Sequence, residues 1–282
     1  MSDGSTDIKG TAPENILLLD GTEASYNAVK SRLEAINAAG SSSPPTLVSK
    51  LFISGSVPEG MDQSELLGLL GSSHNYVQNL YMEPVKEVPT NWYLFTNGNS
   101  TLQSINLPQA TKIGYNAFNK CTGLTSIDLP KVTEIGNRAF AGCTGLTSIN
   151  LPQVTNIGIG AFVGCGKLAS IYLPQVTDIR EDAFFGCTGL KSIVLSGTGT
   201  ENSFALPTYD TQNGLGNYNF SPENLFLTGV TALEDDQITQ CRTWGKMTWA
   251  NIYYNYKGSP SLAEATITEL TNPENYTKVT DK

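Results

Sequence analysis

The sequence lacks most of the patterns on which enzymes rely. Its 282 residues include one histidine, His74, so a Ser-His-Asp or Cys-His site would depend on that residue alone. His74 lies in the turn-like segment 71–75, and the chain contains neither G-x-S-x-G nor H-E-x-x-H. No motif indicates a cofactor. These absences favour a protein without catalytic activity.

Charge and long hydrophobic runs are also scarce. Charged residues make up only 15% of the chain, whereas Ser, Thr, Asn and Gly are plentiful, as suits an extracellular surface. The net charge is −9, of which residues 102–195 contribute +2 and the flanks −11. Neither part offers the basic stripe that nucleic-acid binding needs. No run of about 18 apolar residues occurs, so we expect no membrane span.

A secretory leader is missing from the start of the sequence. Residues 1–13 are polar instead, and we expect them to be a disordered leader or linker. Our hypothesis is that Met1 replaces a removed leader, one that could have ended at a lipidated cysteine. A cytoplasmic origin is the alternative.

What the sequence does have is a repeat. A unit of the form L-x-S-I-x-L-P-x-V-T-x-I-G-x-x-A-F-x-G-C-T-G begins at residues 102, 124, 146, 168 and 190, so its period is strictly constant. Residues 124–145 are one copy. A fixed period of this length marks a solenoid, in which each coil buries its apolar face only against its neighbours.

The order of residues within the unit predicts the shape of one coil. Ile127 and Leu129 alternate with Ser126 and Asp128, the pattern of a half-buried strand, and a proline ends it. A coil this short has no room for a long helix, so A-F-x-G-C forms at most one helical turn. We expect one phenylalanine per coil to stack inside the tube: Phe118, Phe140, Phe162 and Phe184.

The pattern L-x-x-I-x-L-P-x-x-V-x-x-I-G-x-x-A-F-x-x-C over residues 102–195 resembles the BspA-like bacterial leucine-rich repeats, in a version one residue shorter. The resemblance implies an α/β-type repeat solenoid: a right-handed leucine-rich-repeat coil with a concave parallel β-sheet and a helical or irregular convex side. It also implies a secreted or surface-attached protein, often bacterial, used for adhesion or protein binding.

Four of the five cysteines recur with the repeat, at residues 121, 143, 165 and 187. They could form a disulfide or metal ladder, because cysteines in neighbouring coils lie within bonding reach. The alternative is a column of buried thiols that act as small hydrophobes. No histidine accompanies them as in many zinc sites, so we expect the second arrangement and no metal. Cys241 lies outside the column and is expected to be the free thiol.

The flanks continue the solenoid in degenerate form, as terminal repeats often do. We therefore expect a single solenoid over 14–258, with degenerate N-terminal coils (14–101), regular repeats (102–195) and irregular C-terminal coils (196–258). Residues 259–282 are a tail or a C-terminal cap. Strands are predicted at 15–19, 48–53, 77–82, 193–197, 225–229 and 249–254, and helices at 25–39, 61–70 and 233–247.

Aligned strands place two columns of side chains on the concave face. One is polar throughout: Lys50, Asn79, Ser104, Ser126, Ser148, Ser170, Ser192, Asn224 and Asn251. The other includes Val194 and the residues that we expect to bind a ligand, because exposed aromatics beside amides suit recognition: Phe52, Tyr81, Asn106, Asp128, Asn150, Tyr172, Phe226 and Tyr253. The alternative is that flanking loops and the tail cover the rings.

We expect a noncatalytic binding or adhesion module, monomeric, that recognises a host or bacterial surface protein or glycan from an extracellular or cell-surface location. Two alternatives stay open. The repeats could be a rigid spacer without a ligand, or a hydrolase site could lie in 198–250. A glycosidase needs two nearby carboxylates, and the concave face offers only Asp128. Asp178, Glu181 and Asp182 lie on the convex side, where a solvated loop is expected.

Overall fold

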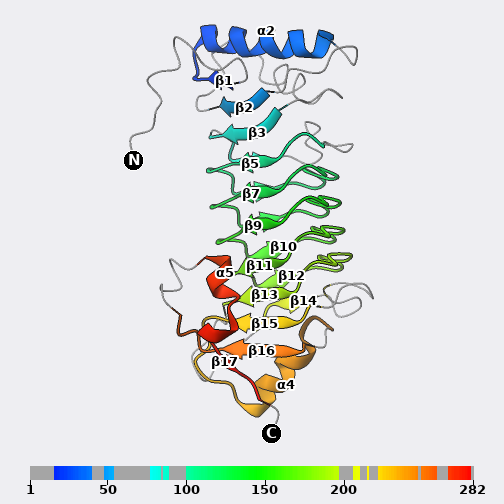
Figure 1. Cartoon of the computed structure of the whole chain (residues 1–282), viewed down its shortest axis with the longest axis vertical. Coiled ribbons are helices and arrows are strands. Elements are labelled where there is room, and N and C mark those ends of the chain that lie inside the picture. The colour runs from blue at the N-terminus through cyan, green and yellow to red at the C-terminus, as the bar shows by residue number, and fades with distance from the viewer. Residues whose placement is uncertain are drawn as a thin grey trace.

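The structure is a computed structural model of the whole chain. It describes residues 16–39, 48–53, 77–83, 85–88, 100–196, 206–209, 215, 222–246, 249–258 and 266–280. Figure 1 shows these residues as a tall stack, in which each turn of the chain lies on the one before it. Two sheets follow the stack, and the hydrophobic core lies between them.

The first sheet, here called the long sheet, has eleven strands within the described residues, and they follow one another in chain order. Neighbouring strands are parallel except for the last pair, β16 and β17, which is antiparallel. The strands are β1 (Ile16–Leu19), β2 (Val48–Ile53), β3 (Val77–Met82), β5 (Ser104–Asn106), β7 (Ser126–Asp128), β9 (Ser148–Asn150), β11 (Ser170–Leu173), β13 (Ser192–Leu195), β15 (Asn224–Leu227), β16 (Asn251–Tyr254) and β17 (Thr277–Lys278).

In the long sheet, the residues that pair between neighbouring strands are those that the two predicted columns align. Tyr81 lies opposite Asn106, and Asn106 opposite Asp128. Asn150 pairs with both Asp128 and Tyr172. The constant period of the repeat therefore sets the register directly, since equivalent residues of successive coils become neighbours. The prediction of stacked parallel strands is confirmed.

The opposite side of each coil differs from the prediction. It was expected to be helical or irregular, but a second parallel sheet, the short sheet, runs along it. Its strands, of two residues each, are β4 (Glu87–Val88), β6 (Lys112–Ile113), β8 (Glu134–Ile135), β10 (Asn156–Ile157), β12 (Asp178–Ile179) and β14 (Thr208–Tyr209).

Threonine hydroxyls support the short sheet. The Thr133 hydroxyl donates a hydrogen bond to the Thr111 carbonyl at 3.2 Å, and the Thr155 hydroxyl donates to the Thr133 carbonyl at 3.1 Å. Each bond links one coil to the previous one. A two-residue strand shows no alternation along the sequence, which is why the sequence pattern missed this sheet.

The core contains the predicted phenylalanine stack. The rings of Phe118, Phe140, Phe162 and Phe184 lie nearly parallel, with successive centroids 5.3, 5.5 and 5.6 Å apart. All four rings are fully buried. Such offset stacking adds to the burial of the rings. The four rings belong to the same core cluster as the buried residues of both sheets, so their loss should affect both.

The cysteines form a column of buried thiols, as expected, and not a disulfide ladder. All five are free and buried, so Cys241 is no different from the others in this respect. The Cys143 thiol donates a hydrogen bond to the Phe118 carbonyl at 3.1 Å, and Cys165 donates to Phe140 in the same way at 3.2 Å. The thiols thus pair with backbone acceptors that the tight turns leave inside the core.

Helices lie at both ends of the stack. Helix α2 (Glu23–Ala39) was predicted at 25–39, and it packs on the first strand through Tyr26, Val29 and Leu33 (Figure 1). Helix α4 (Asp235–Thr243) is shorter than the predicted 233–247. Its end is followed by the single turn η2 (Trp244–Lys246), in which Gly245 has a φ of 71°. The predicted helix 61–70, the leader 1–13 and His74 lie outside the described residues.

Residues 266–280, here called the C-terminal cap, fold back over the long sheet. The cap contains α5 (Ile267–Leu270), η3 (Pro273–Asn275) and β17. Leu270 and Tyr276 pack in one cluster with Val194, Phe226 and Tyr253, which are residues of the second column. The Tyr276 ring centroid lies 5.0 Å from that of Phe226. The cap therefore covers one end of the predicted binding face.

Candidate functional site

The part of the long sheet from β3 to β11 carries the open residues of the second column, and we call them the polar strip: Tyr81, Asn106, Asp128, Asn150 and Tyr172. The side chain of Asn150 is exposed and the other four are partly exposed. Strands in a sheet lie about 4.8 Å apart, so four steps carry the strip about 19 Å from Tyr81 to Tyr172. This length suits an extended ligand that lies across the strands.

Asp128 occupies the centre of the strip between two amides. The Asn106 side-chain amide donates to one carboxylate oxygen of Asp128 and the Asn150 amide donates to the other, both over 3.4 Å. These long bonds orient the amides and leave lone pairs of the carboxylate available. The Asn106 side-chain oxygen is buried and has no hydrogen-bond partner among the described residues. The acceptors that face solvent are therefore the Asp128 carboxylate and the Asn150 amide oxygen, and they suit a ligand that supplies N–H or O–H donors.

Tyrosines mark the two ends of the strip. Desolvation raises the pKa of Tyr81, and the nearby charge of Glu83 adds to the effect. Burial also raises the pKa of Tyr172, against the opposing hydrogen bond with Thr228. Both phenols are therefore neutral at physiological pH and keep a hydroxyl that can donate. Each ring offers contact area with little rotamer freedom to lose.

Two of the predicted site residues are wrong as ligand contacts. Phe226 is 0% exposed and Tyr253 is 7% exposed, because the cap packs its own apolar and aromatic side chains on them. For Phe226 and Tyr253 the structure therefore agrees with the alternative prediction, in which the C-terminal tail covers the aromatic rings. Phe52 keeps its backbone pairing with Tyr81, but its side chain lies outside the described residues.

The first column lies beside the strip and is mostly paired within itself. The Ser104 hydroxyl donates to the Asn79 side-chain oxygen, and Asn251 donates to Asn224 over 2.9 Å. Such pairs between neighbouring strands stabilise the sheet. Ser126 and Ser148 of this column are exposed beside Asp128 and Asn150.

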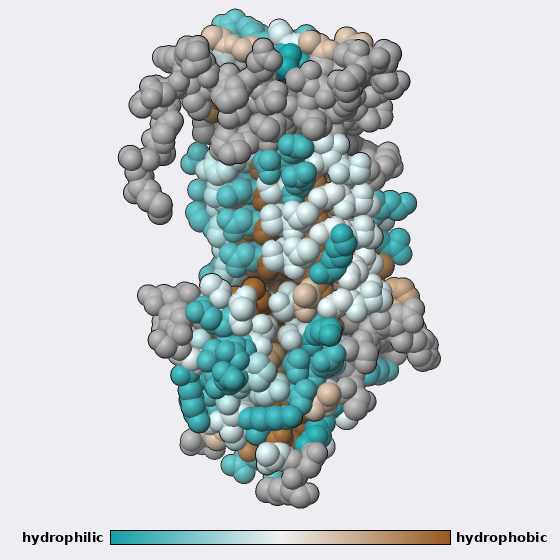
Figure 2. All heavy atoms as spheres, viewed as in Figure 1, coloured by the Kyte–Doolittle hydropathy of each residue, from teal (hydrophilic) through white to brown (hydrophobic). Residues whose placement is uncertain are grey.

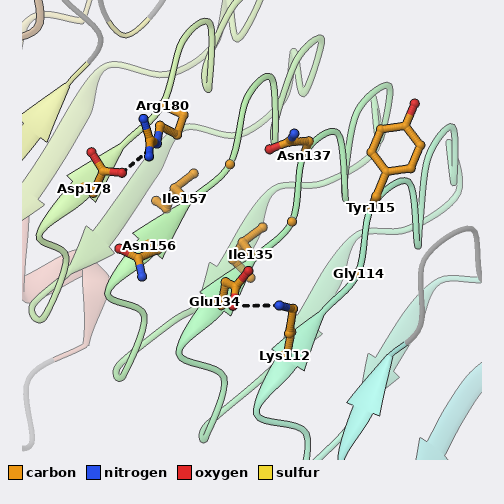
Figure 3. Close-up of a pocket in the computed structure, with 12 residues that line it drawn as sticks. Lys112, Gly114, Tyr115, Glu134, Ile135, Asn137, Asn156, Ile157, Asp178 and Arg180 are labelled. Atoms are coloured by element: carbon orange, nitrogen blue, oxygen red, sulfur yellow. Dashed lines mark ion pairs between the residues drawn. The ribbon is translucent and has the colours of Figure 1, made fainter.

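A groove on the short sheet was missed by sequence reasoning. This side groove has a volume of about 540 Å³ and is lined mainly by polar residues and glycines (Figure 3). Two ion pairs lie along it: Lys112 Nζ is 2.9 Å from Glu134 Oε2, and Arg180 Nε is 2.8 Å from Asp178 Oδ2. Asp178 was expected to lie in a solvated loop. The sequence did contain one sign of this groove, since a polar residue precedes the second isoleucine of each repeat.

The described residues offer little else that could support chemistry. They contain no group of three His, Cys, Asp or Glu side chains arranged to hold a metal. None of the helices in the described part of the chain has the length and apolar character that a membrane span requires. Figure 2 shows hydrophilic and near-neutral residues in lines along the stack, with hydrophobic ones visible only in narrow bands between them.

Comparisons with known proteins agree with the repeat pattern. Residues 90–205 match the family model of the BspA type leucine rich repeat region, in six copies. No curated protein matches the chain. The solved structures that resemble it include the leucine rich repeat protein of T. pallidum, at 27% identity and a TM-score of 0.42, over 61% of this chain and 86% of that one.

Two further solved structures are more distant. A leucine-rich repeat protein from Bacteroides ovatus is 18% identical with a TM-score of 0.38, over 75% of this chain and 52% of that one. A leucine rich cell surface protein from Faecalibacterium prausnitzii is 20% identical with a TM-score of 0.32, over 68% of this chain and 63% of that one. The chain therefore spans only about half to two thirds of these two proteins.

Proposed function

Because residues 90–205 form a BspA-type leucine-rich-repeat region, we propose that the chain is a noncatalytic binding module of a bacterial surface or secreted protein. Its working surface is the polar strip, and its ligand is an extended segment of a partner protein. The observation that carries the proposal is Asp128, held between Asn106 and Asn150 on an open stretch of sheet with a tyrosine at each end.

The chemistry of the strip supports a peptide ligand. A peptide that lies across the strands presents backbone N–H donors, and the Asp128 carboxylate and the exposed Asn150 amide oxygen can accept from them. Tyr81 and Tyr172 would pack against its side chains, and buried tyrosines often contribute most to protein recognition. The strip lies on a sheet fixed by the core, so little conformational entropy is lost when a partner binds.

The proposed location outside the cell rests on composition and repeat type. Only 15% of the residues are charged, and Ser, Thr, Asn and Gly are abundant. A protein of this kind, attached by a lipid or secreted, would present the strip to host or bacterial surface proteins. Adhesion is the role that such a strip would serve.

The test is a binding screen of the purified chain against extracellular-matrix and bacterial surface proteins. The variant Tyr81→Ala/Tyr172→Ala removes both ends of the strip. We expect it to lower the affinity for the partner at least tenfold, because the loss of a tyrosine that anchors an interface costs about 2 kcal/mol or more.

The matched control is Tyr115→Ala, which removes a tyrosine that is 40% exposed and lies on the other side of the coil, beside the short sheet. It should leave partner binding unchanged. A partner that the double variant retains would place the contact elsewhere, and the absence of any partner would favour a spacer.

A further inference from the structure

We propose that the side groove is a second binding site and that it takes a neutral saccharide of one or two rings. The groove belongs to the short sheet, so this site is separate from the polar strip and does not depend on the function proposed for it. The proposal rests on the floor of the groove, on one exposed ring and on the balance of its charges.

Bare backbone forms the floor of the groove. The same position holds glycine in three successive coils, Gly114, Gly136 and Gly158, and all three line the groove. A Cβ atom at Gly136 would lie 2.8 Å from the backbone of Gly114, so the close stacking of the coils requires glycine there. The three glycines therefore let the coils stack closely and line the groove with backbone.

Side chains bound this hollow at both ends. Arg180 stands at the glycine position of the next coil, and Figure 3 shows its side chain at the opposite end of the groove from Tyr115. The groove is open to solvent, and its volume of about 540 Å³ lies within the usual range for small-molecule sites, about 300–1,000 Å³. A site of this size accepts one or two sugar rings but not a folded partner.

The exposed ring is Tyr115. It is 40% exposed, one of three large hydrophobic side chains so exposed in the described part of the chain. Its place at the end of the groove, in Figure 3, leaves a ring beside a polar floor. Aromatic rings have an electron-rich face that attracts weakly positive C–H groups, and a sugar ring presents a face of such groups.

The charges of the groove cancel. Lys112 pairs with Glu134 and Arg180 pairs with Asp178, so the ionised side chains that line it sum to zero, although the whole chain carries −9. A charged ligand would gain no net attraction. A polyol is different, because its hydroxyls can donate to the carboxylates and accept from the lysine and arginine at the same time.

Asn156 supplies a further polar group between the two ion pairs. Its side chain is exposed, lines the groove, and makes no hydrogen bond to the described residues. An amide both donates and accepts, which suits adjacent hydroxyl groups on one ring. The lining therefore combines a ring platform, a neutral amide and two self-compensating ion pairs, and this set fits a neutral sugar better than an ion or an apolar molecule.

The experiment is saturation-transfer NMR on the full chain with four neutral disaccharides: maltose, cellobiose, lactose and chitobiose, each up to about 10 mM, since a small open site binds weakly. At least one should receive saturation from the protein. Tyr115→Ala should weaken that sugar about tenfold, and Asn156→Arg, which fills the groove, should abolish its binding. Sialyllactose, which is anionic, should bind no better than lactose.

The control is Phe185→Ala, which removes an aromatic of similar exposure that does not line the groove. It should leave saccharide binding unchanged, and thermal melts of all variants should match the parent. The proposal is wrong if no disaccharide receives saturation, or if a bound sugar survives both Tyr115→Ala and Asn156→Arg. A clear preference for sialyllactose would also overturn it. None of these results bears on the polar strip.

Discussion

The long and short sheets are built from the same repeated unit, yet they present different surfaces. Strands of the long sheet in the regular repeats have three or more residues, so two columns of side chains stand next to each other and give a flat polar face. Strands of the short sheet have two residues, and in the regular repeats the second of them is a buried isoleucine. Each of these strands therefore places only one side chain on the outer surface, and glycines without side chains follow it. The surface there is a groove. Strand length within a coil thus decides between a flat face and a groove.

The largest effect should come from the core that both sheets share. Phe140→Ala removes a ring stacked on Phe118 and Phe162, and such a change costs about 3–5 kcal/mol of unfolding free energy. Chemical denaturation followed by circular dichroism measures it. Phe185→Ala, at an exposed position, should change stability by less than about 0.5 kcal/mol. Equal losses in the two variants would contradict a core that supports both sheets.

The cap covers one end of the long sheet and leaves the rest of its outer face exposed. Leu270→Ala should destabilise the protein by about 2–3 kcal/mol, the low end of the range for a buried leucine, because the cap packs on one side of the sheet only. It should also expose Phe226 and Tyr253 and increase the fluorescence of a hydrophobic dye. Thr268→Ala, at an exposed position of the same short helix, is the control. A stable variant without added dye binding would show that the cap is not what covers these rings.

High pH should weaken the core between the sheets. Burial raises the pKa of the Cys143 and Cys241 thiols to about 12, whereas a thiol in the unfolded chain titrates near 8.5. The native state therefore keeps these protons to higher pH than the unfolded chain does. The contribution of the thiols to stability is fully present below the unfolded pKa and is lost as the pH rises from about 9 towards 12.

Denaturation midpoints between pH 7 and pH 11 measure this loss, which is about 1 kcal/mol per pH unit for each thiol. The raised pKa of the partly buried Tyr172 acts in the same direction. The pH dependence of the parent is therefore compared with that of Cys143→Ala, whose stability should fall less steeply as the pH rises. An unchanged slope would mean that the thiol column does not carry the effect.

The smallest effect is expected at the rim of the side groove. The hydrogen bond and charge of Glu134 raise the pKa of Lys112, so this ion pair stays charged, but both side chains are about half exposed. Exposed ion pairs contribute little to stability. Lys112→Ala should leave the melting temperature unchanged. A large loss of stability would contradict a surface role.

Much of the fold follows from the constant period of the repeat. It predicts the strands of the long sheet, the pairing of Asn106 with Asp128 and the stack through Phe140, because equivalent residues become neighbours. The short sheet was not predicted, because a two-residue strand such as Glu134 and Ile135 has no periodicity of its own. The side groove lies on that sheet and was not predicted either. Its floor is the backbone of closely stacked glycines, and a sequence pattern indicates such glycines only as bends.

The predicted site residues differ in their exposure. Asn150 is exposed and Tyr172 is partly buried against the cluster that the cap forms, whereas Phe226 and Tyr253 are buried under the cap. Nothing in the repeat connects residues 266–280 to the long sheet. Their packing depends on the shape of the finished surface, which an alignment of repeats does not contain.

The central claim is that the long sheet, and not the short one, binds the protein partner. Asn150 and Asn156 provide a direct test, because both are exposed asparagines of the same coil and they lie on different sheets. Each is changed to arginine, and the affinity for a partner found in the screen is measured by surface plasmon resonance. We predict that Asn150→Arg abolishes binding and that Asn156→Arg leaves it within twofold of the parent. Loss of binding with Asn156→Arg alone would contradict the account.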